Sequence, residues 1–320
     1  MEHSSALRRA AIWSFLALAL IAVPILPDVH RQKWVRWFGK KTCEPRMHVV
    51  GLINRVSEYW LGLKVLSPGA TSIVSIMWVS GIRRVNVLIG KQKSGLKECL
   101  MESPSQMGQD ALALILNQGN ESNFFVEAGA CDGRYSSNTW LLESRCNWTG
   151  ILCEPGQIWH EELIKSRSCQ IDTRALWSTT GQQILFHQTE LPNLSTIDSF
   201  TDVDMHADDR RGGLTYSVET VSLVDLLDEK GAPHYIQFLS LDTEGTELAI
   251  LQNFPFERYE FGVIVCEHNN TAAESLIRDL LVRNGYTYLD GLRNISLGDA
   301  WFIGPKTRSR LNDQLRLRNR

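Results

Sequence analysis

The stretch Phe125-Val126-Glu127-Ala128-Gly129-Ala130-Cys131-Asp132-Gly133 decides the fold of this chain. A short apolar run ends in an acid, and two glycines follow it. Glycine lets the backbone turn sharply and pass close to a ligand. The helix expected at residues 138–144 then offers unpaired N–H groups at its start. A strand, a glycine turn and a helix in this order indicate the first unit of a parallel α/β sheet with a ligand at its edge.

The alternation of strands and helices continues toward the C-terminus. It begins near residue 105 and predicts a mostly parallel sheet. We expect strands at 123–128, 150–153, 169–172, 184–188, 217–221, 235–241, 261–266, 286–289 and 300–303, and further helices at 158–165, from 247 onward and at 273–284. A polar loop rich in Asp and Arg is expected at 192–213, either lining the acceptor site or solvated.

Acidic residues stand where several of these strands end, which is the edge where open parallel sheets bind ligands. Glu154 is placed to accept both hydroxyls of a ribose, although a surface loop is the alternative. Asp172 is placed to meet an adenine amino group, with a structural role equally open.

The first turn is unsuited to a dinucleotide. A dinucleotide fold shows G-x-G-x-x-G to seat a pyrophosphate, whereas Glu127 would repel one. A carboxylate suits the cationic methionine end of S-adenosylmethionine. We assign to this cofactor pocket the residues Glu127, Gly129, Asp132, Gly133 and Asn138, together with Glu154 and Asp172.

A second acidic stretch is Ser240-Leu241-Asp242-Thr243-Glu244-Gly245-Thr246-Glu247. Asp242 and Glu244 are placed to touch cofactor or substrate, while Glu247 suits the first turn of a helix. After the next strand comes Glu267-His268-Asn269, where a Glu or His can accept a proton from a hydroxyl. The catalytic candidates are therefore Asp242, Glu244 and His268. The carboxylate pair is commoner as a charged rim than as a metal site, and we expect no metal.

These segments together resemble the FkbM family of S-adenosylmethionine-dependent methyltransferases. The resemblance covers residues 105–304 and rests on Ser105 to Asp110, Phe125 to Gly133, Ser137-Asn138-Thr139, Glu154-Pro155, Leu241 to Glu247, Glu267-His268-Asn269 and Asp299-Ala300-Trp301-Phe302. It implies an α/β, Rossmann-like class I methyltransferase fold, whose seven-stranded, mostly parallel sheet carries helices on both faces. It also implies O-methylation with S-adenosyl-L-methionine as cofactor, on a hydroxyl of a sugar or other small or glycan acceptor.

A non-enzymatic alternative stays open. Animal Star-like membrane proteins resemble the same family and act in secretory cargo trafficking. The intact glycines and carboxylates favour the enzyme, because a binding module has no physical need of them all.

The first 30 residues predict a membrane anchor. Residues 10–27 are an uncharged apolar run after Arg8 and Arg9, near the minimum length for a spanning helix, with a signal peptide as the rival. Basic residues at 31–46 place the following domain in the cytosol. Sequons at Asn120, Asn147, Asn193, Asn269 and Asn294 favour a Golgi or ER lumen instead. The side remains undecided.

The segments outside the predicted domain, the net charge and the cysteines complete the sequence analysis. Residues 31–104 are interpreted as a juxtamembrane stem and residues 305–320 as a short basic tail. The net charge of -3 gives no reason to expect nucleic acid as a partner. Of the seven cysteines, Cys146 and Cys169 are a possible disulfide pair in an oxidising compartment.

Overall fold

The computed structural model describes residues 73–76, 85–88, 102–117, 123–292 and 298–318. The described residues all belong to one compact unit within Ser57–Arg320. The anchor expected at residues 10–27, and most of the expected stem, therefore lie outside the described residues. In the part that is described, no helix combines the length and apolar character needed to cross a bilayer.

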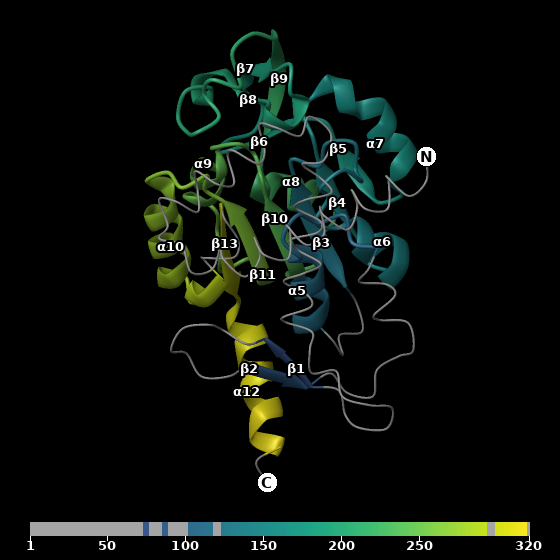
Figure 1. Ribbon diagram of the computed structural model, residues 1–320, viewed down its shortest axis with the longest axis vertical. Coiled ribbons are helices and arrows are strands. Elements are labelled where there is room, and N and C mark those ends of the chain that lie inside the picture. The colour runs from purple at the N-terminus through teal and green to yellow at the C-terminus, as the bar shows by residue number, and fades with distance from the viewer. Residues whose placement is uncertain (1–72, 77–84, 89–101, 118–122, 293–297, 319–320) are drawn as a thin grey trace, which may run out of the picture. The chain divides into compact units, whose positions relative to one another are not determined.

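A central sheet carries the architecture (Figure 1). Its order is β12-β13-β11-β10-β3-β4-β5. The strands are β3 (Phe124–Ala128), β4 (Thr149–Cys153), β5 (Gln170–Asp172), β10 (Tyr235–Leu241), β11 (Glu260–Glu267), β12 (Thr287–Tyr288) and β13 (Asp299–Ile303). The five strands from β11 to β5 pair in parallel, and β13 runs antiparallel to both of its neighbours.

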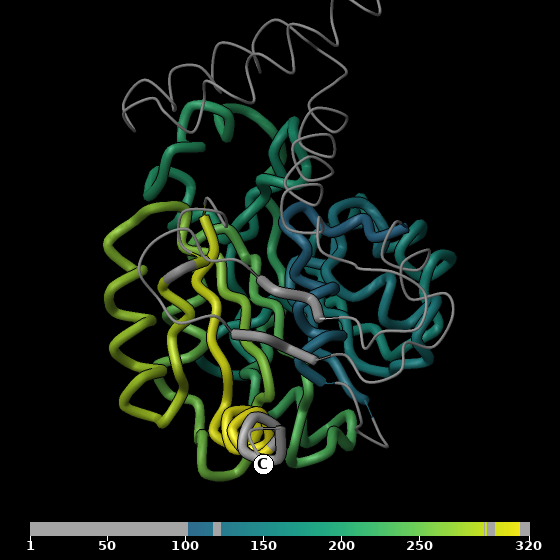
Figure 2. The backbone as a smooth tube through the Cα atoms, turned by 60° about the horizontal axis from the view of Figure 1, so that its bottom comes forward, coloured from purple at the N-terminus to yellow at the C-terminus, as the bar shows by residue number. Residues whose placement is uncertain are grey.

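Side chains alternate between the two faces of this sheet, and each face is covered by helices. Apolar residues of α5 (Gln109–Leu116), α6 (Trp140–Cys146) and α7 (His160–Ser166) pack with one set of strand residues, such as Phe125 and Phe238. The other face packs against α8 (Leu223–Glu229), α9 (Glu247–Leu251) and α10 (Ala273–Arg283). Figure 2 shows α10 running beside β13. The expectation of an α/β fold is confirmed. The central strands are apolar throughout because both faces are buried.

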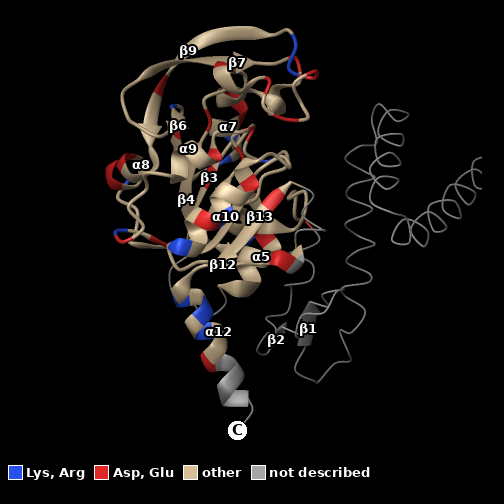
Figure 3. Ribbon diagram, turned by 90° about the vertical axis from the view of Figure 1, so that its left-hand side faces the viewer, with Lys and Arg blue, Asp and Glu red and all other residues tan. Residues whose placement is uncertain are grey.

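The segment interpreted as a short basic tail, residues 305–320, is helical over most of its length. The chain forms helix α12 (Pro305–Arg318), which carries Lys306, Arg308 and Arg310 (Figure 3). Pro305 suits the first helical position, because its fixed φ is that of a helix and the N–H it lacks would have no partner there. Thr307 is fully buried and its hydroxyl meets the Tyr235 hydroxyl at 2.8 Å. The high charge of this segment led the sequence analysis to miss a helix, whose first turn packs against the sheet.

An insertion between β5 and α8 forms a second, smaller sheet. Its order is β6-β9-β7-β8, with β6 (Ala175–Trp177), β7 (Gln183–Gln188), β8 (Thr196–Ile197) and β9 (Leu214–Ser222). The loop expected at residues 192–213 lies within it and contains β8 and the short helices η3 (Pro192–Leu194) and η4 (Asp198–Phe200). Thr196 Oγ1 donates to the Glu244 carbonyl at 2.9 Å. The insertion therefore contacts the main sheet at its carboxyl edge.

Two smaller features concern the rest of the chain. Within the expected stem, β1 (Ile73–Ile76) and β2 (Val85–Leu88) form an antiparallel pair. The possible disulfide between Cys146 and Cys169 is not formed.

Candidate functional site

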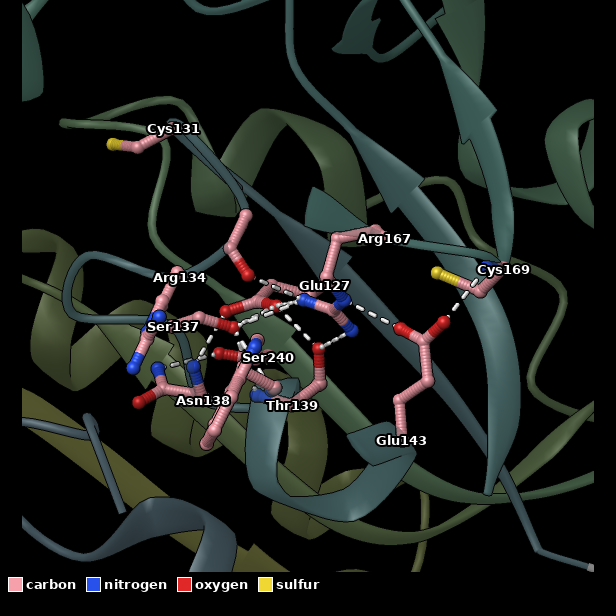
Figure 4. Close-up of polar contacts among 12 residues, drawn as sticks. Glu127, Cys131, Arg134, Ser137, Asn138, Thr139, Glu143, Arg167, Cys169 and Ser240 are labelled. Carbon is pink, nitrogen blue, oxygen red and sulfur yellow. Dashed lines mark hydrogen bonds and ion pairs between the residues drawn. The ribbon is translucent and has the colours of Figure 1, made fainter. Parts of the chain in front are cut away.

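Glu127, at the end of β3, is bound from within the protein (Figure 4). Its carboxylate accepts from Ser137 Oγ at 2.9 Å and from the Asn138 backbone N–H at 2.6 Å, and Thr139 Oγ1 donates to it as well. Burial raises the pKa of Glu127, while Arg167 and these donors oppose the rise. The carboxylate thus fixes the start of α6 against the end of β3, and its direct contact with a cofactor stays a prediction.

Arg167 completes this network, and the sequence reasoning missed it. Its Nη1 lies 3.7 Å from Glu127 Oε2 and donates to the Gly133 carbonyl at 2.9 Å. Its Nε donates to Glu143, and its side chain is almost wholly buried. No local pattern marks Arg167, because it stands beyond α7 and reaches Glu127 only in the folded chain. It supplies the counter-charge that makes a buried acid tolerable at this turn.

The glycine turn after Glu127 is required by close packing. A Cβ on Gly129 would lie 1.8 Å from the Asp242 carbonyl oxygen, and the residue has φ +81°. A Cβ on Gly133, at φ +80°, would meet the side chains of α7 and Arg167. Asp132 Oδ1 accepts the backbone N–H groups of Arg134 and Tyr135 at 2.8 and 2.6 Å. Asp132 therefore stabilises the turn itself.

Asn138 joins the first strand to the second acidic stretch. Its Nδ2 donates to Ser240 Oγ at 2.9 Å, and its Oδ1 accepts from Ser105 Oγ at 3.0 Å. Asn138 is buried. These contacts order the carboxyl edge between β3 and β10, as the pairing of those strands requires.

Glu154, at the end of β4, faces the same turn. Its Oε2 accepts the Cys131 backbone N–H at 2.8 Å and its Oε1 accepts the Gly156 N–H at 2.7 Å. Burial raises its pKa to about 7, and the two N–H groups oppose that rise. The structure thus brings Glu154 together with the glycine turn, two segments that the sequence analysis assigned to one pocket.

Asp172, at the end of β5, lies in a different environment. Arg174 donates to it from the backbone N and from Nε, both at 3.0 Å, and from Nη2 at 2.8 Å. Lys230 Nζ is 3.2 Å away. The pKa of Asp172 is lowered because these donors outweigh burial. Its carboxylate is engaged in an ion-pair network, and a role toward adenine stays a prediction.

The second acidic stretch places carboxylates from two neighbouring strands together. Leu241 and Cys266 are register partners in β10 and β11, so Asp242 and Glu267 follow side by side. One carboxylate oxygen from each of Asp242, Glu244 and Glu267 lies within 4.8 Å of the others. Burial raises the pKa of Asp242, and burial with the Asp242 charge raises that of Glu267 well above its usual range.

The oxygens of this cluster are spaced as in a divalent-cation site. Glu244, however, is bound by protein donors, and Asp242 and Glu267 lie beside each other. Glu244 accepts from Arg210 Nη2 at 2.6 Å and from Asn269 Nδ2 at 3.2 Å. Burial and the Asp242 charge raise its pKa, and Arg210 opposes the rise.

Arg210 was not singled out by the sequence analysis. It lies in the loop expected to be polar and solvated, yet it is 2 % exposed. Its Nη1 and Nη2 donate to Asp204 at 2.7 and 2.9 Å, and its Nε donates to the Leu194 carbonyl at 2.8 Å. An arginine in a loop rich in Asp and Arg carries no sequence mark of burial.

His268 is the third catalytic candidate, and it is buried. Its backbone N–H donates to the Gly298 carbonyl at 2.7 Å, and its Nδ1 accepts the Asn270 N–H at 3.1 Å. Because Nδ1 is engaged in this contact, Nε2 is the ring nitrogen that a catalytic role would use. The catalytic role of His268 stays a prediction.

Comparison with known proteins bears on these observations. No curated protein matches the chain. The family model described as the methyltransferase FkbM domain matches residues 127–288, from the buried acid at the end of β3 to the end of β12. The match includes Glu154, Asp242, Glu267 and the insertion. It covers slightly more than half of the 320 residues, so the chain belongs to the FkbM methyltransferase family.

Proposed function

We propose that this protein is an S-adenosylmethionine-dependent O-methyltransferase with the class I methyltransferase fold. The observation that carries the proposal is the placement of Glu154, whose buried carboxylate faces the glycine turn after β3. The reversed strand β13 beside β11 and the family membership support the same conclusion.

The residues at this edge fit the cofactor. Each oxygen of Glu154 accepts one backbone N–H, and a carboxylate oxygen can accept a further donor. Glu154 is thus suited to two ribose hydroxyls. The surrounding carboxylates Glu127 and Asp242 suit a cationic ligand rather than a pyrophosphate. When bound, the cofactor supplies an electrophilic methyl group.

The acceptor side belongs to the ends of β10 and β11. Asp242, Glu244 and His268 stand there, and carboxylates suit a hydroxyl donor. Their role would be to orient the acceptor hydroxyl and receive its proton. We propose a sugar or another glycan or small-molecule hydroxyl as acceptor, as the family resemblance implies.

The test is calorimetric titration of the full-length protein with S-adenosylhomocysteine. Wild-type protein should bind, and Glu154→Gln should weaken binding at least about tenfold through the loss of charge-assisted hydrogen bonds. Glu161→Gln, on the exposed side of α7, is the matched control and should bind as wild type does. A folded wild-type protein without affinity would overturn the proposal and favour a non-catalytic role.

We further propose that residues 10–27 anchor the protein in a membrane as a single span. Deletion of residues 1–30 should move the protein from the membrane pellet to the supernatant of a cell lysate. Endoglycosidase sensitivity of the full-length chain distinguishes the sides, because only a lumenal domain is glycosylated at Asn147 or Asn193. Retention of the truncated chain in the pellet would contradict the anchor.

A further inference from the structure

Two carboxyl groups at the acceptor side lie against each other. Asp242 and Glu267 follow the register pair Leu241 and Cys266 on adjacent parallel strands. One carboxylate oxygen of each lies within 4.8 Å of an oxygen of the other. Two like charges this close repel strongly where water is largely excluded, so the pair favours a state in which one of the two carboxyl groups holds a proton.

The third member of the cluster, Glu244, differs from this pair in its hydrogen-bond partners. Glu244 Oε2 accepts from Arg210 Nη2 at 2.6 Å and from Asn269 Nδ2 at 3.2 Å. The guanidinium also binds Asp204, with the charged ends of both side chains shielded from water. Arg210 gives Glu244 a counter-charge and opposes the rise that burial and the Asp242 charge give its pKa. Among the described residues Asp242 and Glu267 have no such ion pair, so full ionisation is costlier for this pair than ionisation of Glu244.

Most of the groups that surround the pair also oppose its full ionisation, whereas His206 opposes the rise in the pKa of Asp242. Glu247 is held by the N–H groups of Thr243 and Gly245, and Asp299 accepts from Gln109 Nε2 at 2.8 Å. Among the described residues no Lys or Arg forms an ion pair with Asp242 or Glu267. The charged and titratable groups that face the pair are Glu154, Glu244, Glu247, Asp299, His206, Cys131 and Cys266, with Arg210 and Asp204 behind Glu244.

The pair borders the turn that we assign to the cofactor. The Asp242 carbonyl oxygen occupies the space beside Gly129 where a Cβ would lie. The Asp242 and Glu154 charges raise the pKa of Cys131, which places both acids near that turn. A positive charge held at the turn would therefore favour ionisation of the pair.

We propose that Asp242 and Glu267 share one proton, release it when the positively charged cofactor binds, and take a proton from the acceptor hydroxyl during methyl transfer. This inference rests on the proposed function. In the transfer the carbon–sulfur bond breaks with its electrons left on sulfur, a carbon–oxygen bond forms, and the hydroxyl proton passes to a carboxylate oxygen of the pair. The site loses the sulfonium charge and gains a proton on the pair, so its net charge is conserved.

Glu267 thereby becomes a catalytic residue beside Asp242, and Arg210 a positioning residue that keeps Glu244 out of the proton exchange. Release of the shared proton also makes the site bind the charged cofactor more tightly than its neutral product, because the ionised pair attracts only the charged ligand. Removing water from the site strengthens this discrimination, because charges interact more strongly where the effective dielectric is low.

The experiment is calorimetric titration of the full-length protein at pH 7 with S-adenosylmethionine and with S-adenosylhomocysteine. Each is run in two buffers of different ionisation enthalpy, which gives the number of protons released on binding. S-adenosylmethionine should release about one proton more than S-adenosylhomocysteine. Glu267→Gln leaves no shared proton and should reduce that difference to near zero while both ligands still bind. Glu161→Gln should keep the wild-type difference.

The outcomes separate this inference from the proposed function. Tight binding of both ligands with equal proton release would overturn proton sharing and leave the cofactor site intact. Binding of neither ligand by folded protein would overturn both. Stoichiometric Mn²⁺ binding that is lost in Glu267→Gln would also overturn proton sharing, because a cation would then hold the carboxylates in the proton's place.

Discussion

Arg210 Nη2 donates to Glu244 Oε2 over 2.6 Å, and this contact joins the insertion to the end of the main sheet. The two residues come from chain segments that the sequence interprets differently, one as a loop and one as a site. Because the guanidinium also binds Asp204 and the Leu194 carbonyl, three parts of the chain are held by one buried cation. Loss of that cation would leave two buried carboxylates without their shared partner.

Replacement of Arg210 should therefore destabilise the protein strongly. Arg210→Met leaves Asp204 and Glu244 buried without their cation, which costs about 3–5 kcal/mol. Arg211→Met removes a neighbouring ion pair whose side chains are 80 % and 83 % exposed, and should change stability by less than about 0.5 kcal/mol. Urea unfolding measures both. Equal effects of the two substitutions would refute the buried network.

A double-mutant cycle isolates the contact itself. Adding Glu244→Gln to Arg210→Met should cost much less than the sum of the two single changes, because the second substitution removes the stranded charge. Strict additivity would show that Arg210 acts through Asp204 alone.

The close approach of Gly129 to Asp242 predicts that an alanine is not tolerated there. Gly129→Ala places a Cβ 1.8 Å from the Asp242 carbonyl oxygen and should cost on the order of 3 kcal/mol or more. Gly181→Ala is the matched control, because Gly181 has the same φ of +81° and open space around its Cβ position. That control should cost only about 1–2 kcal/mol, the strain of the left-handed backbone. Thermal unfolding compares the two variants, and a similar loss in both would contradict the packing.

The buried carboxyl groups predict a loss of stability as the pH rises toward 8. Burial raises the pKa values of Asp110, Glu154, Glu247 and Asp299 to about 7 each. A raised folded-state pKa means that the folded protein keeps protons that the unfolded chain has already lost. The stabilisation is complete below the unfolded value and is lost as the pH rises through about 7.

Urea unfolding at about pH 5.5 and pH 8 tests this dependence. The free energy of unfolding should be lower at the higher pH, by at least about 1 kcal/mol for each group. Asp299→Asn should make the dependence shallower, because an amide does not titrate, whereas Glu161→Gln should leave it unchanged. A protein that is more stable at pH 8 would contradict the prediction.

Helix α12 should contribute to the stability of the domain. Thr307→Val removes the hydroxyl that meets the half-buried Tyr235 phenol, at a cost of about 1 kcal/mol. Ser309→Val, two residues further on, should have a smaller effect because Ser309 is exposed. Denaturant unfolding of both variants is the measurement. Equal losses of stability in the two variants would show that the Thr307 contact does not stabilise the domain.

The local patterns in the sequence determined the order of strands and helices along most of the domain. The strand at Tyr235–Leu241 has the bounds expected from its apolar run, since both faces of a central parallel strand are buried. Helices α5 and α8 were missed. Both are short, and burial on the sheet stabilises them. The one local signal, the Ser222 cap of α8 that accepts the Asp225 N–H, was overlooked.

The sequence by itself also placed acids at the ends of β3, β4 and β10, because strand ends can be read from the apolar runs that precede them. Only the tertiary structure decided what those acids contact. Arg167 reaches Glu127, Arg210 reaches Glu244, and Asp242 meets Glu267 across segments that are far apart in the chain. Ion pairs and shared protons depend on distances of a few ångströms, and those distances exist only after the chain has folded.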